Sequence, residues 1–98
     1  MSVQGKWNIT IKTPIGDRSG VLDLIVDGEN LSGSLSEGEH FAAITNGRID
    51  GNKLTWSAKL TKPMRMSFKF SATVAAGHIQ GSAKYLLGSA TFSGGRAQ

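Results

Sequence analysis

The sequence predicts an all-β fold, namely a single eight-stranded antiparallel up-and-down meander barrel spanning residues 1–98. Three observations lead to this prediction. Apolar and polar residues alternate with a period of two along most of the chain, as in strands with one buried face. Turn signals separate the alternating runs at a spacing of roughly ten to twelve residues, which is typical of barrels and sandwiches. No segment shows the period of a helix.

The clearest alternation lies between residues 52 and 74, on both sides of the break at Lys62-Pro63. The apolar positions are Leu54, Trp56, Ala58 and Leu60 before the break, and Met64, Met66, Phe68, Phe70, Ala72 and Val74 after it. The positions between them hold serine, threonine, lysine and arginine. This pattern predicts an antiparallel hairpin with one apolar face and one cationic, hydroxyl-bearing face.

The other strands are expected on either side of this hairpin. The first ends at Thr13-Pro14, and residues 14–20 form a longer loop before the second. Asp27-Gly28 and Asp50-Gly51 are tight-turn signals, and the alternation slips at Asn46-Gly47, which predicts a β-bulge. The expected strands are residues 6–12, 21–26, 31–36, 41–49 and 78–86, followed by a last strand that holds Ala90, Phe92 and Gly94.

Strand closure follows from the short connections. Short loops make consecutive strands neighbours in the sheet. Pairing the first strand with the last removes two exposed edges, so a closed barrel is preferred to an open sandwich. An eight-stranded barrel is filled by side chains or holds one small ligand, and the sequence leaves both possibilities open. The expected interior combines large residues (Trp7, Trp56, Phe68, Phe70, Phe92) with small ones (Gly33, Ala58, Ala72, Gly81, Ala83, Ala90).

Composition excludes several classes of protein. A chain of 98 residues is long enough for one domain and one core. It has no cysteine, so disulfides, thiol nucleophiles and thiolate metal sites are excluded. No apolar run approaches the roughly 20 residues that span a bilayer, and we expect no membrane partner. The N-terminal residues lack the apolar core of a signal peptide, which predicts a cytoplasmic protein.

The formal net charge of +4 could indicate a nucleic-acid partner. However, the basic residues are spread singly along the expected strands, without a basic run. This spacing is typical of solvated outer faces, so we expect no nucleic-acid partner.

The two ends of the expected barrel differ. One end receives both termini and the tight turns Asp27-Gly28, Asp50-Gly51 and Ala76-Gly77. The other end receives residues 14–20, 36–40, 61–64 and 86–88, which combine apolar residues with both signs of charge. Such a rim suits a binding site. It also suits a plug for the core or a homodimer contact, and these alternatives remain open.

Gly5-Lys6-Trp7 at the first strand, eight meander strands and Arg96 after the last strand resemble the calycin barrels, which comprise lipocalins, fatty-acid-binding proteins and avidin-like proteins. The resemblance implies that Trp7 lies at the closed end and that Arg96 packs across it as a cation–π pair. The chain is shorter than lipocalins and lacks their following helix and lid loop. It looks closest to small bacterial stand-alone barrels, whose relatives are also found attached to amidohydrolase-type enzymes.

Catalytic and metal chemistry have few candidates. The two histidines, His40 and His78, are expected at opposite ends of the barrel, and no calcium-loop spacing is present, so no metal and no cofactor are expected. No nucleophile elbow occurs. His40 and Tyr85 are the weak candidates for acid–base catalysis, beside Glu37 and Glu39 at the expected open end.

These observations favour a barrel that binds a small apolar or amphipathic molecule. The alternatives are a small isomerase or cyclase that uses the same cavity, and an interaction module that forms a homodimer or docks on an enzyme. Two methionines suit a binding wall because their flexible thioethers adapt to irregular shapes. The residues expected to bury the ligand are Phe41, Ile44, Trp56, Met64, Met66, Phe68 and Tyr85. Those expected to orient its polar head are Arg18, His40 or Lys62.

Overall fold

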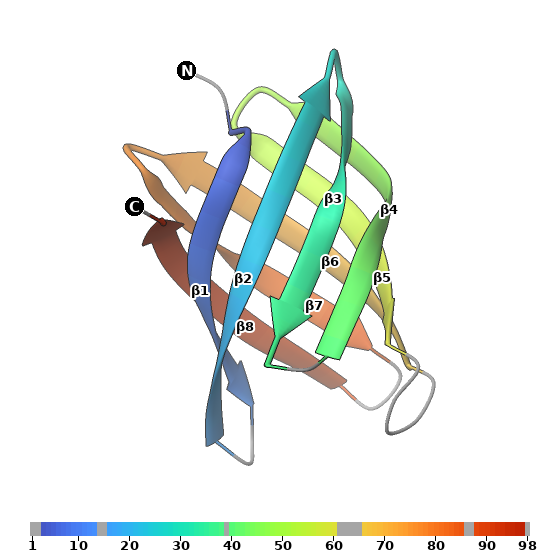
Figure 1. Cartoon of the computed structure of the whole chain (residues 1–98), viewed down its shortest axis with the longest axis vertical. Coiled ribbons are helices and arrows are strands. Elements are labelled where there is room, and N and C mark those ends of the chain that lie inside the picture. Colours follow the sequence, from blue (N-terminus) through green and yellow to red (C-terminus); the bar gives the residue numbers. More distant parts are fainter. Residues whose placement is uncertain (1–2, 14–15, 39, 61–65, 86–87, 98) are drawn as a thin grey trace.

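A computed structural model describes residues 3–13, 16–38, 40–60, 66–85 and 88–97. Eight antiparallel strands follow one another around a closed barrel, and the last pairs with the first (Figure 1). This confirms the predicted all-β meander barrel. The strands are β1 (Gly5–Thr13), β2 (Gly16–Asp27), β3 (Asn30–Glu37), β4 (His40–Asp50), β5 (Lys53–Leu60), β6 (Met66–Ala75), β7 (His78–Tyr85) and β8 (Gly88–Arg96). Among the described residues no helix could cross a membrane.

The core follows the predicted alternation. The side chains of Trp7, Leu22, Leu24, Leu54 and Ile79 are completely buried, and each occupies an inward position of its strand. Small residues such as Ala58 and Ala72 face inward beside the aromatic rings, so large and small groups interlock. One continuous cluster of buried residues therefore extends along the barrel from Trp7 through Trp56 to Ala42 and Ala58.

The slip in the fourth strand is a β-bulge, as predicted. Asn46 and Gly47 of β4 together oppose Trp56 of β5, because the pairing passes from Thr45 with Ser57 to Arg48 with Thr55. Asn46 has a φ of 52°, in the left-handed region that asparagine tolerates. A Cβ on Gly47 would lie 2.0 Å from the carbonyl oxygen of Leu31, so only glycine fits beside β3.

The prediction of a loop over residues 14–20 is wrong from Gly16 onward. β2 begins at Gly16, and Asp17 and Arg18 pair with Lys12 and Ile11 of β1. Residues 16–19 are exposed to water on both faces of the strand. They therefore lack the alternation of buried and exposed residues that marks a half-buried strand. Backbone pairing with β1 extends the strand without that signal.

A ring of hydrogen bonds seals the end that holds both termini and the tight turns (Figure 1). Each turn accepts a backbone N–H from the strand beyond its own hairpin: Glu29 from Ile49, Asn52 from Val74, and Gly77 from Arg96. Ala97 N–H donates to the Lys6 carbonyl, and Val26 N–H donates to Oε1 of Gln4. We call this the closed end.

Trp7 and Arg96 form the predicted pair at the closed end. The guanidinium carbon of Arg96 lies 4.6 Å from the centre of the Trp7 ring, and its Nη1 donates to the Gln4 carbonyl at 2.7 Å. The Trp7 Nε1–H donates to the Val3 carbonyl at 2.9 Å. The predicted cation–π contact is confirmed, and every polar group of the indole is satisfied.

Candidate functional site: the open end of the barrel

The opposite end of the barrel is formed by the hairpins β1–β2, β3–β4, β5–β6 and β7–β8 (Figure 1). We call it the open end. Inward-facing side chains continue to the ends of these strands. Near the ends they are partly exposed to solvent. Ile11, Leu35, Phe68 and Tyr85 are all intermediate in burial. Groups that continue the core therefore meet solvent here.

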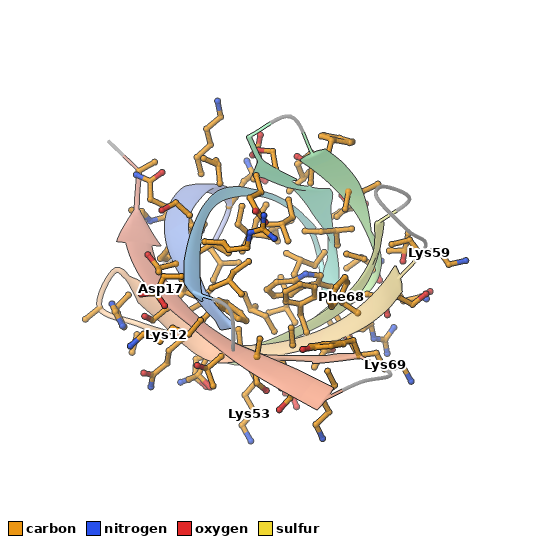
Figure 2. The ribbon with its side chains drawn as sticks, turned by 90° about the horizontal axis from the view of Figure 1, so that it is seen from below. Lys12, Asp17, Lys53, Lys59, Phe68 and Lys69 are labelled. Carbon is orange, nitrogen blue, oxygen red and sulfur yellow. The ribbon has the colours of Figure 1, made fainter. Side chains whose placement is uncertain are left out.

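A row of aromatic side chains runs from the middle of the barrel to the open end along β5, β6 and β7. Trp56 stacks on Phe70 with ring centres 5.1 Å apart, and Phe70 contacts Phe68 at 6.1 Å. Phe68 in turn contacts Tyr85 at 5.4 Å. Figure 2, which looks toward the open end, shows Phe68 inside the ring of strands. These four residues form the aromatic row, an apolar wall for a ligand at this end.

An ion pair lies on the other side of the open end. Nε of Arg18 on β2 is 2.6 Å from Oε1 of Glu37 on β3. Arg18 pairs in register with the inward-facing Ile11, and Glu37 shares the face of Leu35, so both charges belong to the inner surface. In a closed barrel of eight strands, β2 lies half a turn from β6 and β3 half a turn from β7. The charged pair and the aromatic row therefore face each other across the opening.

The indole N–H of Trp56 has no hydrogen-bond partner among the described residues, although the side chain is only 2% exposed. A buried donor without an acceptor costs about 1–3 kcal/mol. Most buried donors in proteins are satisfied, so such a group needs an explanation. Trp56, the innermost residue of the aromatic row, therefore has an N–H donor that no described residue satisfies.

The predicted ligand-binding residues do not all lie together. Ile44, Trp56, Phe68 and Tyr85 are inward-facing, as expected. Phe41 is not, because it is 66% exposed and pairs with the outward Ser36, so it cannot contact an interior ligand. The strand begins at His40, one residue earlier than expected, and Ala42 takes the inward position beside Phe41. Lys62 and Met64, together with the side chains of His40 and Met66, lie outside the described residues.

Sequence reasoning missed two features of this site. It placed Phe70 in the interior without assigning it to the site, although its parity with Phe68 was visible. It placed Glu37 beside the catalytic candidates without a partner, whereas the structure pairs it with Arg18. The sequence pattern did not indicate that β2 extends to Gly16. This extension places Arg18 close to Glu37 of β3.

The weak catalytic candidates are not neighbours. Tyr85 ends β7, whereas His40 begins β4, three strands away around the barrel. In the register His40 is the partner of Glu37. In the part of the chain that the structure describes, no three histidine, aspartate or glutamate side chains gather as they would around a metal ion.

Two surface hollows lie outside the barrel wall. One of about 450 Å³ lies over β1 to β3 and is bordered by Thr10, Ser19 and Ser36. The other, of about 320 Å³, lies over β4 to β7 and is bordered by Lys69 and Lys84. Trp56 and Phe70 of the aromatic row also border the second hollow, whose remaining side chains point to the outer face.

Comparisons with protein-family models, with curated proteins and with solved structures found no match. The likeness to calycin barrels therefore rests on the closed meander and on the Trp7–Arg96 contact.

Proposed function

We propose that this protein binds a small amphipathic molecule at the open end of the barrel. The observation that carries the proposal is the buried, unpartnered Nε1–H of Trp56 at the inner end of the aromatic row. A ligand with a hydrogen-bond acceptor would satisfy this donor and remove the cost of leaving it buried. Phe68 and Tyr85 are the partly exposed members of the row, so the ligand would approach from the open end.

The two sides of the opening fit the two parts of such a ligand. The partly exposed rings of Phe68 and Tyr85 would cover its apolar body. The Arg18–Glu37 pair would hold its polar group, with the guanidinium attracting an anionic head. We include in this proposal the calycin-like identity and the cytoplasmic location that were inferred from the sequence.

The test uses the fluorescent amphipathic anion 8-anilinonaphthalene-1-sulfonate, titrated into the folded protein. We expect saturable binding to one site. Phe68→Ala should weaken it about tenfold, since an aromatic contact and its buried area contribute on the order of 1–2 kcal/mol. Phe41→Ala is the matched control, because it removes the same side chain from the outer face.

Equal affinity of the Phe68→Ala and Phe41→Ala proteins would refute the open-end site. Both variants must first show the wild-type near-ultraviolet circular dichroism, because the probe also binds loosened cores. Native mass spectrometry of the protein purified gently from its own host would then identify a retained natural ligand.

A further inference from the structure

Charge is divided unevenly between the two halves of the barrel. All seven acidic residues lie at or before Asp50, whereas seven of the eleven basic residues follow it. Because the strands follow one another around the barrel, the second half of the sequence forms one continuous wall, β5 to β8. That wall carries the positive charge of the protein.

Cross-strand pairing gives the lysines nearest the acidic residues an opposite charge as partner. Lys6 is the register partner of Asp23, Lys12 of Asp17 and Lys53 of Asp50. Opposite charges at such positions stabilise a sheet. Figure 2 shows Lys12 and Asp17 side by side on one flank of the barrel.

Beyond Lys53, the outer face of β5 to β7 lacks this compensation. Lys69 of β6 is the direct partner of Lys84 of β7, and Lys59 pairs with Ser67. Among the described residues neither Lys69 nor Lys84 has a carboxylate partner. Like charges directly opposite each other destabilise a sheet. Lys59 and Lys69 point outward on the flank away from Asp17 (Figure 2).

The hollow of about 320 Å³ lies between Lys69 and Lys84, and hydrogen-bond donors border it together with Trp56 and Phe70. The β-bulge adds the amide of Asn46 to its border. The outward side chains around it are Asn46, Thr55, Ser57, Lys69, Ser71, Ser82 and Lys84, with no carboxylate among them. We call these residues, together with Lys59, the lysine face. Hydroxyls, amides and lysines are the groups that contact phosphate oxygens.

The scarcity of outward-pointing apolar side chains narrows the choice of anionic partner. Among the described residues of β5 to β7, no phenylalanine, tyrosine, tryptophan or branched aliphatic side chain points outward. Protein interfaces depend on such anchors, single-stranded nucleic acids stack on exposed aromatic rings, and membrane-surface segments insert apolar groups. The phosphate backbone of a duplex needs none of these.

We propose that the lysine face binds the phosphate backbone of a nucleic-acid duplex, without reading its sequence. The lack of a basic run in the sequence led to the opposite expectation. Antiparallel pairing, however, brings lysines together that are 15 positions apart in the chain, as with Lys69 and Lys84. The lysine face lies outside the barrel and the proposed ligand site lies inside, so either proposal can fail without the other.

The test is fluorescence anisotropy with a labelled DNA duplex of about 20 base pairs at several salt concentrations. Neutralising three phosphates predicts a slope of log affinity against log salt near −2.7. The affinity should then fall roughly 40-fold between about 50 and 200 mM salt. A single strand of the same length should bind no more tightly, because the face offers no stacking platform.

The decisive variant is Lys69→Gln with Lys84→Gln. It should reduce the magnitude of the salt slope by about two, and it should fold well because it removes a repulsive pair. Lys6→Gln with Lys12→Gln is the matched control on the compensated flank, and its binding should change far less. The proposal fails if the duplex does not bind at about 50 mM salt, or if both double variants weaken binding equally. Tighter binding to the single strand, or to vesicles of anionic lipid, would also overturn it.

Discussion

The barrel contains two tryptophans with the same degree of burial and opposite hydrogen bonding. Trp7 at the closed end is 0% exposed, and Trp56 at the start of the aromatic row is 2% exposed. The indole N–H of Trp7 donates to the Val3 carbonyl, and Arg96 covers its ring. The indole N–H of Trp56 finds no acceptor among the described residues.

The surroundings of the two tryptophans differ in the same way. At the closed end, backbone hydrogen bonds link each turn to the strand beyond its hairpin. Toward the open end, aromatic side chains remain partly exposed and the charged pair Arg18–Glu37 lies at the surface. The closed end therefore provides stability, whereas the other half keeps groups that a ligand could satisfy. Functional sites commonly retain such unsatisfied groups.

The largest effect is expected at the closed end. Trp7→Ala removes a completely buried aromatic side chain and its hydrogen bond. The free energy of unfolding should fall by about 3–5 kcal/mol, as for buried aromatics generally. Urea denaturation of this variant and of Phe41→Ala provides the comparison, since the exposed phenylalanine should contribute less than about 0.5 kcal/mol. A loss below about 1 kcal/mol for Trp7→Ala would contradict the role of the closed end.

A smaller effect is expected for Arg96→Met, which keeps a long side chain but removes the charge. The cation–π contact and the hydrogen bond to the Gln4 carbonyl should together contribute about 1–2 kcal/mol, because the guanidinium is largely exposed. Lys12→Met removes a cation from the outer face of the same region and should change stability by less than about 0.5 kcal/mol. Equal losses in both variants would indicate a general charge effect.

Alternation was enough to predict the barrel, because burial of one face imposes a period of two. It identified the inward positions of the strands other than the fourth, and the slip at Asn46-Gly47 located the bulge. It failed where burial no longer imposes the pattern. Residues 16–19 pair with β1 although both of their faces meet water, so no alternation marks a strand there.

The candidate site was only partly predictable for a related reason. Trp56, Phe68 and Tyr85 follow from parity, whereas Phe41 was assigned inward and lies outside, because it alternates with the inward Ala42 and Ile44. The lysine face was also invisible in the linear sequence. Lys69 and Lys84 meet only through the register of β6 with β7, which depends on the turn between them.

The smallest effect on stability, and the sharpest test of the comparison, is expected for Trp56→Phe. Phenylalanine keeps the stacking on Phe70 and removes the unsatisfied donor. The lost volume costs on the order of 1 kcal/mol, and removing a buried unpartnered N–H returns a similar amount. Stability should therefore change by less than about 1 kcal/mol, whereas Trp7→Phe should lose about 2 kcal/mol with its hydrogen bond and its contact to Arg96. If urea denaturation showed equal losses for the two variants, the N–H of Trp56 would be satisfied within the protein. The case for a ligand acceptor at that position would then be lost.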